Sequence, residues 1–300
     1  MALSYQQIQT RKSLDATAST VQINTSIPTN STIESLIIKV DGLQNGATDS
    51  TDMALAGKLN LITLMADSVK TEINHTDLVR FNQRVWNSPV TTMISEDDGE
   101  GVSVVSTYNC NPITVNGNTC FDEPYGAPPN SIRNINISYN ADIAATDNTF
   151  LTVWACTNTK KSETLGYTQF KRTERDCIAG SIIDDPINDL SSFMGWGSWV
   201  YTGPKDVTAA IPAALTVRGV QLISGGAIMD QVTGDAMISG GVRYASDSNS
   251  DTLVTIKNYD FMWLDFGIRS GGRPLPQSSY MRVEEGASNK RRSYACGLGF

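Results

Sequence analysis

His75 is the only histidine among the 300 residues, so any mechanism that needs an imidazole must use it. A Ser-His-Asp or Cys-His mechanism would depend on this one side chain, and a histidine-rich zinc site is excluded. No G-x-S-x-G elbow, P-loop or dinucleotide-binding glycine motif accompanies it. His75 falls where a predicted strand passes into a predicted helix, and we interpret it as a polar turn residue rather than a general base. We therefore expect no catalytic residue, no cofactor and no enzymatic activity.

Two groups of carboxylates could also do chemistry. One is an acidic turn that could bind Ca²⁺, formed by Glu96, Asp97, Asp98 and Glu100. Its spacing lacks the alternating ligands and the distal glutamate of an EF-hand loop, so we favour a solvated turn and keep these residues as a weak metal candidate. The other group is Asp184-Asp185, a pair of the kind that a glycoside hydrolase uses, although any acidic protein contains several such pairs.

Aromatic residues could bind carbohydrate at the segment Gly195-Trp196-Gly197-Ser198-Trp199. Close packing of an indole on a backbone without side chains explains this alternation of glycine and tryptophan, and stacking of a sugar on the rings is the alternative.

The five cysteines include no CxxC pair and are spread along the chain, at Cys110, Cys120, Cys156, Cys177 and Cys296. Cys110 and Cys120 flank a loop that could close as a disulfide under oxidising conditions. We expect all five thiols to be reduced and buried.

Basic residues are too few to wrap nucleic acid, because the formal charge is −8 and the sequence pI is about 4.7. We single out Arg11 and Lys12 near the start and the run of three Lys290-Arg291-Arg292, which we interpret as a solvated turn. We predict that these five residues contact a neighbouring subunit or an anionic membrane surface.

The composition indicates a β-rich chain, since only 18% of residues are charged while Asn, Ser, Thr and Gly are abundant. No stretch approaches the ~18 consecutive apolar residues of a membrane-spanning helix, and the start lacks the pattern of a signal peptide.

Alternating apolar residues predict short strands throughout the chain. In the first half they are Thr20–Ile27, Ile33–Val40, Leu59–Met65, Val69–Ile73, Val102–Tyr108, Ile132–Tyr139 and Phe150–Cys156, with a helix at Leu78–Val85. In the second half they are Tyr167–Arg172, Asp176–Ile183, Val217–Ile223, Ile228–Val232, Thr252–Ile256, Tyr259–Ile268, Tyr280–Glu284 and Tyr294–Phe300. We expect Tyr259–Ile268, the most apolar of these, to lie centrally between two sheets.

An internal echo indicates a duplication. The segment Leu59–Asp77 (apolar strand, small turn, short strand, Asp) returns as Val217–Asp235, about 158 positions later. Because Thr157–Glu163 is polar and has no periodicity, we place the domain boundary there, with domains at 19–160 and 161–300. Residues 1–18 are too poor in apolar side chains for a core, so we predict an N-terminal arm whose residues 2–15 could be deleted without unfolding the chain.

The order of these features resembles a known family. The opening TVQINTSIPTNSTIESLIIKVDG followed by LNLITLMADSVKTEINHTDLVRFNQ is similar to the strands, turn and short helix of small double jelly-roll major capsid proteins of the adenovirus, tectivirus and corticovirus lineage. The resemblance implies an all-β fold of two tandem eight-stranded antiparallel jelly rolls with short connecting helices. It also implies homotrimers that form pseudo-hexagonal capsomers of an icosahedral bacteriophage shell over an internal membrane.

That resemblance sets the expected partners and location. The chain would contact itself, neighbouring capsomers, other capsid proteins such as a penton, and an internal viral membrane. It would be made in the host cytoplasm and reside in the virion. Two other classes stay open: a glycan-binding spike or adhesin, which would use Trp196 and Trp199, and a carboxylate-dependent glycoside hydrolase.

Overall fold

The computed structural model divides the chain into two compact units, Met1–Thr168 and Gln169–Gly299. The division lies inside a strand rather than at the predicted boundary between residues 160 and 161. The residues that the structure describes are 3–14, 17–44, 56–84, 91–94, 101–110, 126–140, 146–159, 166–187, 190, 192–201, 217–233, 261–265, 275, 278–286 and 288–299.

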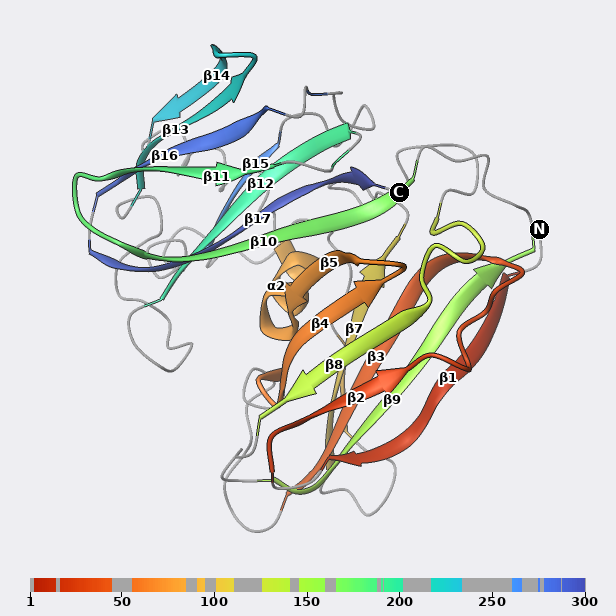
Figure 1. Cartoon of the computed structure of the whole chain (residues 1–300). Helices are drawn as coiled ribbons and strands as arrows, with labels where there is room; N and C mark the ends of the chain where they lie inside the picture. Colours follow the sequence, from red (N-terminus) through yellow and green to blue (C-terminus); the bar gives the residue numbers. More distant parts are fainter. Residues whose placement is uncertain are drawn as a thin grey trace, which may run out of the picture. The chain divides into compact units, whose positions relative to one another are not determined.

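The first unit contains two antiparallel sheets (Figure 1). One has the order β1-β9-β3-β7-β6, with bounds Leu3–Leu14, Thr146–Asn158, Thr32–Gln44, Gly101–Asn109 and Thr91–Ile94. The other has the order β2-β8-β4-β5, with bounds Ser19–Ile23, Asn134–Tyr139, Leu59–Met65 and Val69–Asn74. Helix α2, His75–Arg84, follows β5 directly and packs on β7, β4 and β5.

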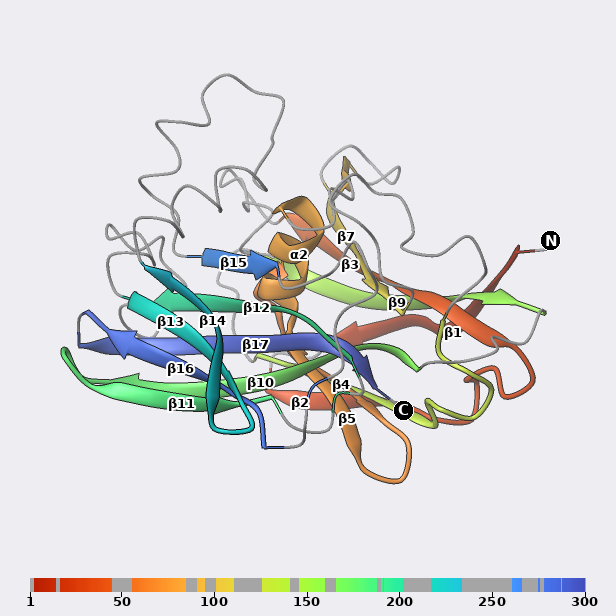
Figure 2. The same ribbon diagram turned by 90° about the horizontal axis from the view of Figure 1, so that it is seen from above.

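The second unit also contains two sheets. One has the order β10-β17-β12-β15, with bounds Tyr167–Cys177, Asn289–Gly299, Ser192–Tyr201 and Phe261–Asp265. The other has the order β11-β16-β13-β14, with bounds Ile182–Pro186, Tyr280–Glu285, Val217–Ser224 and Ala227–Thr233. Figure 2 shows the β13–β14 hairpin extending from its sheet.

The two units repeat one strand order. The order β1-β9-β3-β7 matches β10-β17-β12-β15, and β2-β8-β4-β5 matches β11-β16-β13-β14, position for position. The hairpin β4–β5 therefore corresponds to β13–β14, which are the two segments whose sequences echo each other. The predicted duplication is confirmed at the level of topology, and β6, at the edge of the first unit, has no counterpart among the described strands of the second unit.

Alternation of apolar and polar residues explains why these segments form strands. In β8, Ile135, Ile137 and Tyr139 are buried, while the residues between them are only half-buried. A strand with one face on the core and one toward water has this period of two. In α2 the buried positions Leu78 and Phe81 instead follow helical spacing, as predicted.

The N-terminal arm is a wrong prediction, because residues 3–14 form β1. This strand pairs with β9 and buries Ile8 and Leu14 in the core of the first unit. Two register shifts, between Gln7 and Gln9 and between Gln9 and Lys12, break the period of two. Because bulges of this kind make the spacing between buried residues irregular, the apolar residues of this segment do not show the alternation that predicts a core strand.

Two predictions in the second unit also need correction. The strand predicted at Asp176–Ile183 is interrupted by a turn in which Gly180 has φ +79°, a left-handed conformation that glycine adopts readily. The basic run 290–292 is part of β17 rather than a solvated turn. Among the described strands, β15 pairs with β12 and is last in its sheet, but its flanking residues lie outside the described part of the chain, so the central position expected for Tyr259–Ile268 stays a prediction. The strand predicted at Thr252–Ile256 lies outside the described residues.

Among the residues that the structure describes, no helix has the length and apolar character needed to cross a membrane.

Candidate functional site

His75 is the first residue of α2 and is completely buried. Its Nδ1 lies 2.8 Å from the carbonyl oxygen of Ala56, and its Nε2 lies 2.8 Å from Oγ of Ser106 in β7. A carbonyl oxygen can only accept, so Nδ1 carries the proton and Nε2 accepts from the serine hydroxyl. Burial lowers the pKa of His75 to about 4, although the bond to Ala56 opposes this shift. The imidazole is therefore neutral at pH 7.

The polar residues around His75 attach helix α2 to strand β7. Asn82 of α2 donates from Nδ2 to the carbonyl of Thr107 and accepts from the Thr107 amide, both at 2.8 Å. This side chain thus pairs with β7 as a neighbouring strand would. The interpretation of His75 as a residue of a strand-to-helix turn agrees with its place in the chain, but no sequence pattern indicated that the ring is buried and hydrogen-bonded on both nitrogens.

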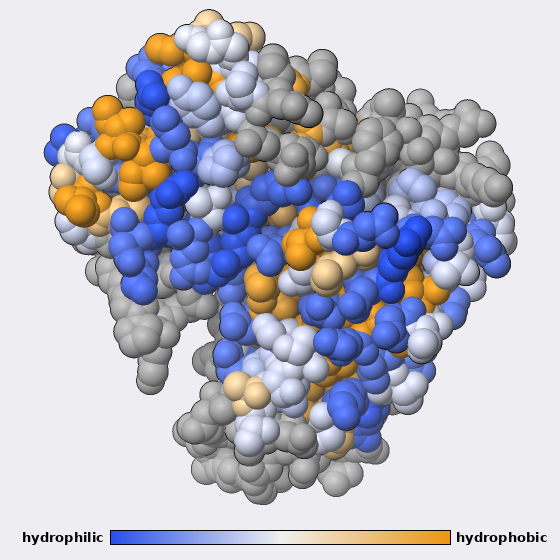
Figure 3. Space-filling model, viewed as in Figure 1, coloured by the Kyte–Doolittle hydropathy of each residue, from blue (hydrophilic) through white to orange (hydrophobic). Residues whose placement is uncertain are grey.

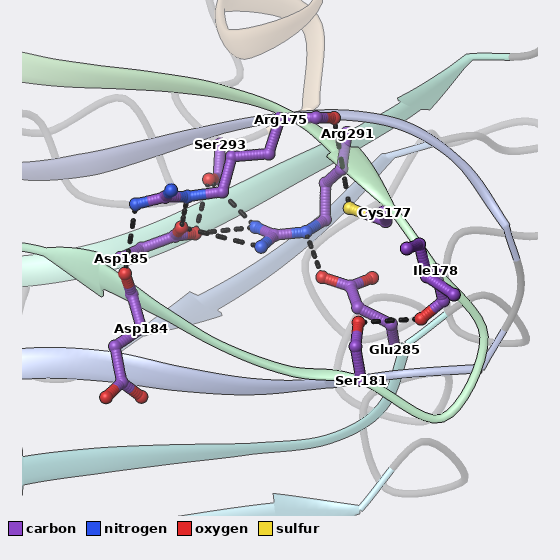
Figure 4. A network of polar contacts seen from close by, with 9 residues as sticks. All are labelled: Arg175, Cys177, Ile178, Ser181, Asp184, Asp185, Glu285, Arg291 and Ser293. Carbon is purple, nitrogen blue, oxygen red and sulfur yellow. Dashed lines mark hydrogen bonds and ion pairs between the residues drawn. The ribbon is translucent and has the colours of Figure 1, made fainter.

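A cluster of buried charges lies inside the second unit (Figure 4). Arg291 of β17 is 1% exposed, and its Nη1 lies 2.6 Å from Oδ2 of Asp185 in β11. Its Nε lies 2.8 Å from Oε1 of Glu285 in β16. Ser293 accepts from Arg291 at 2.9 Å and donates to Asp185 at 2.6 Å. The cluster therefore joins β17 of one sheet to β11 and β16 of the other.

Arg175 of β10 completes the cluster. Its Nε lies 3.1 Å from Oδ1 of Asp185, and its Nη2 lies 3.1 Å from the Asp184 carbonyl. Arg291 also lies over the ring of Trp196, with its guanidinium carbon 5.7 Å from the ring centroid. Two arginines and two carboxylates make the set neutral overall, which is the condition under which charges can be buried.

The cluster shifts the pKa values of its members. Burial opposes the charge of Arg291, but Asp185 and Glu285 more than offset it, so the pKa of this guanidinium is raised. Burial raises the pKa of Glu285, with Arg291 acting in the opposite direction. Burial also raises the pKa of the Cys177 thiol to about 11, although Arg291 acts against this too. The thiol is therefore not poised as a nucleophile.

The basic residues predicted to make surface contacts divide into two groups. Arg11 and Lys12 are exposed on β1, where Arg11 lies 4.1 Å from the ring centroid of Phe150. Lys290 is exposed and lies 3.7 Å from Asp176. The other two members of the run, Arg291 and Arg292, are buried, so the surface role predicted for them is wrong.

The remaining predicted sites are distributed as follows. The weak metal candidates Glu96, Asp97, Asp98 and Glu100 lie outside the described residues. Within the described part of the chain, no group of three or more His, Cys, Asp or Glu side chains could hold a metal ion. The buried thiols are Cys110, Cys156, Cys177 and Cys296, as predicted, and Cys120 lies outside the described residues.

The geometry disfavours Trp196 as a glycan-binding residue and Asp184-Asp185 as a catalytic pair, while the side chain of Trp199 lies outside the described residues. Trp196 is fully buried in the core of the second unit and offers no face to a sugar. Asp184 and Asp185 are neighbours in a strand, so they point to opposite faces of the sheet. Asp185 faces the buried Arg291, whereas Asp184 faces the exposed Arg282 at 2.9 Å. These two carboxylates cannot meet at one glycosidic bond.

Comparison with known proteins supplies the fold. No protein-family model matches the sequence, and no curated protein matches it either. The structure is similar to the major capsid protein P2 of bacteriophage PM2, with a TM-score of 0.63 and 12% identity over 100% of this chain and 100% of that one. It is similar to the STIV MCP, with a TM-score of 0.64 and 11% identity over 99% and 97% of the two chains. A chain of the PBCV-1 virus capsid matches with a TM-score of 0.60 and 8% identity over 99% and 93%.

The chain has the double jelly-roll fold. Each of its units closes eight matching strands into two facing sheets, which is the jelly-roll arrangement. The predicted all-β class and the predicted resemblance are therefore confirmed. In this double jelly roll the buried charge cluster belongs to the second roll, and the hydrogen bonds of His75 belong to the first.

Proposed function

We propose that this chain is a major capsid protein, a structural subunit that builds trimeric, pseudo-hexagonal capsomers of an icosahedral virus shell. The observation that supports this most strongly is the similarity to the PM2 major capsid protein along the full length of both chains. The match covers both rolls. It is therefore more specific than a match to one β-sandwich, because single jelly rolls occur in many proteins with unrelated functions.

The repeat supports trimers on geometric grounds. Two rolls with one strand order present similar modules, so three chains arranged around a threefold axis provide six similar modules. Six modules in a ring can tile a hexagonal lattice. The role is structural, and the buried residues fit it: His75 and Arg291 hold elements together rather than facing a substrate.

The remaining partners are part of the same proposal. The subunit contacts neighbouring capsomers and a penton-type protein, in the virion of a bacteriophage, after synthesis in the host cytoplasm. The exposed Arg11, Lys12 and Lys290 are proposed contacts with a neighbouring subunit or an anionic lipid surface of an internal membrane. β1 holds Arg11 and Lys12 on a rigid edge strand instead of a loose arm.

Sedimentation velocity of the purified full chain over a range of concentrations tests this function. We expect a trimer near three times the 32.5 kDa mass of the chain, and hexagonal outlines in electron micrographs. A chain that stays monomeric at every concentration and ionic strength would contradict the proposal. A glycan array offers a second arm, since a strong hit on the trimer would point instead to a spike or adhesin.

A further inference from the structure

The outer face of the sheet β1-β9-β3-β7 in the first roll carries large side chains that water can reach. In the strand register Gln7 of β1 pairs with Trp154 of β9, which pairs with Ile37 of β3. The residues on either side of Trp154 are fully buried in the core, so Trp154 points outward with its two partners. Tyr5, two residues before Gln7 without an intervening register shift, lies on the same face and is 64% exposed. Gln7 is exposed, and Trp154 and Ile37 are half-buried.

The matching face of the second roll is covered within the chain. β17 corresponds to β9, and the repeated aromatic-Ala-Cys sequence places Tyr294 where β9 has Trp154. Tyr294 points away from the core of the second roll, since the adjoining Ala295 packs in that core. Its ring is nevertheless fully buried and meets the ring of Phe170 of β10 edge-on, with centroids 6.2 Å apart. Leu298, on the same face, is 1% exposed. A face that is closed in one roll is thus open in the other.

The size of the open face suits a protein partner. Its strands β1, β9, β3 and β7 are 12, 13, 13 and 9 residues long. At about 3.3 Å per residue and about 4.8 Å between strands, they span roughly 750 Å². A stable protein interface buries roughly 800 Å² on each partner. The charged Lys39 and Asp41 on this face form an ion pair at 2.8 Å, so a partner can cover both charges together.

We propose that the second roll of a neighbouring copy of this chain covers the outer face of the sheet β1-β9-β3-β7. The inference rests on the proposed function, because it treats the six rolls of a trimer as similar modules of one ring. Similar modules in a ring use matching surfaces for their contacts. The face that is covered in the second roll is therefore the face that a neighbour covers in the first. In a ring of three chains with two rolls each, the neighbour that another chain provides to a first roll is a second roll.

Tyr5 and Trp154 are the expected centre of this contact. They occupy diagonal positions of β1 and β9, where aromatic side chains can reach one another across a pair of strands. Aromatic rings that leave water on binding supply much of the affinity of a typical interface. Because β1 is a strand of the sheet, Tyr5 is held in place before the partner arrives, and little conformational entropy is lost on binding.

Sedimentation velocity of the purified full chain and two double variants tests the inference. Tyr5→Glu/Gln7→Glu places two charges on the open face at exposed positions, where the fold tolerates them. The matched control Thr20→Glu/Gln22→Glu places the same two charges on β2, at exposed positions on the outer face of the other sheet. Figure 3 shows that control face at the front of the first roll, where hydrophilic side chains are mixed with apolar ones.

The open-face variant should lose trimers, because the two carboxylates would be buried in the contact without a cation. We expect its trimer to dissociate at a concentration higher by a factor of about 10 or more, and the control to match the wild type. Equal thermal transitions of the two variants show that both are folded. Equally stable trimers in all three chains would overturn the inference and leave the proposed function intact. A wild-type chain that is monomeric at every concentration would contradict both.

Cross-linking identifies the partner surface directly. Benzoylphenylalanine in place of Tyr5 is irradiated in mixed assemblies of nitrogen-15-labelled and unlabelled chains, and mass spectrometry maps the products. We expect cross-links between copies that reach residues 169–299. Cross-links to residues 1–168 of the other copy, or no cross-link between copies in a stable trimer, would overturn the inference.

Two further outcomes separate the inference from the alternatives. A label that reacts with phosphatidylcholine vesicles, and not with the other copies in the trimer, would assign the face to a membrane and overturn the inference. Dimers cross-linked from Tyr5 to the second roll of the other copy would support the inference while contradicting the trimeric function.

Discussion

In the second roll the charged side chains of Arg291, Asp185 and Glu285 are buried and paired between the two sheets. The matching positions of the first roll hold three side chains without charge, Leu151, Ile23 and Tyr139, all of them buried. The two rolls share a strand order, so this contrast shows that the fold does not dictate how its middle is filled. At these positions the first roll uses apolar packing, and the second uses ions that pair between its sheets.

The sequence and the register establish this match. An aromatic-Ala-Cys sequence ends both inner strands, at 154–156 in β9 and at 294–296 in β17, and Leu151 and Arg291 stand five residues before the two cysteines. The first residue of β4 pairs with Tyr139, as the first residue of β13 pairs with Glu285. Ile23 pairs with Ile135 of β8, and Asp185 pairs with Met281 of β16. These two partners are at corresponding positions, because each lies four residues before Tyr139 or Glu285.

The largest effect should come from removing β1, the counterpart of β10. Deleting residues 2–15 removes the partner of β9 together with the buried Ile8 and Leu14. We expect the first roll to lose its cooperative unfolding transition, while the second roll, which retains β10, keeps its own. Differential scanning calorimetry measures both. Two unchanged transitions would make β1 the dispensable arm that the sequence indicated.

A large effect is also expected from Arg291→Leu, which places the residue of the first roll in the second. Glu285 then stays buried without its cation and Asp185 keeps only Arg175, and breaking such a buried pair costs about 3–5 kcal/mol. Urea unfolding at pH 7 measures the loss. The matched variant Arg291→Leu/Asp185→Ile/Glu285→Tyr carries all three first-roll residues and should regain most of the stability, because the charge that loses its partner, Arg175, is 39% exposed and can be solvated. A triple variant weaker than the single one would show that the rolls differ in more than this cluster.

Acid should act on the first roll through His75. Its folded pKa of about 4 lies below the ordinary value of 6.5, so the unfolded chain binds the proton more tightly. The contribution is fully present above pH 6.5 and is lost as the pH falls through 6.5 to about 4, by about 3 kcal/mol at most. Stability measured at intervals across this range checks the prediction.

The variant His75→Asn isolates this contribution. Its amide nitrogen can replace Nδ1 as a donor to Ala56 but does not titrate, so it should flatten the dependence on pH between 6.5 and 4. In the strand register Thr233 corresponds to Asn74, so the sequence position that corresponds to His75 is Gly234, which does not titrate either. An unchanged pH profile in the variant would assign the acid sensitivity to other groups.

The smallest effects concern two glycines. A Cβ at Gly126 would lie 2.5 Å from the carbonyl oxygen of Ile33, in the bridge that Ala127 makes with β3, so Gly126→Ala should cost about 2 kcal/mol. In the second roll, Gly180 has open space and only its positive φ opposes a side chain, so Gly180→Ala should cost about 1 kcal/mol. Thermal unfolding compares the two. Equal costs would mean that the bridge at Ala127 can shift to make room.

Local patterns were sufficient for much of the fold. Strands such as β4, predicted and found at Leu59–Met65, carry their own alternation, and the echo of Leu59–Asp77 in Val217–Asp235 indicated the duplication. The turn at Gly180 was missed because the flanking apolar residues Ile178 and Ile182 continue a strand-like pattern across it, although both are exposed.

The buried charges lay beyond the reach of the sequence for a physical reason. A run such as Lys290-Arg291-Arg292 reads as solvated unless a partner offsets the cost of burial, and Asp185, the partner of Arg291, is 106 positions away. The repeated aromatic-Ala-Cys sequence could have indicated that Arg291 is buried, since it aligns Arg291 with Leu151, a core residue of the first roll. Composition could not supply it, because it counts charges without placing them.

The sequence by itself determined the class, the positions of most strands and the repeat, because side-chain alternation and turn residues act over a few neighbours. Only the tertiary structure decided that β1 closes the first roll, that His75 is sealed neutral against Ala56 and Ser106, and that Arg291 is an interior residue. Each of these depends on a partner far away along the chain. Strand pairing and charge burial are set by contacts made in space, which no local pattern contains.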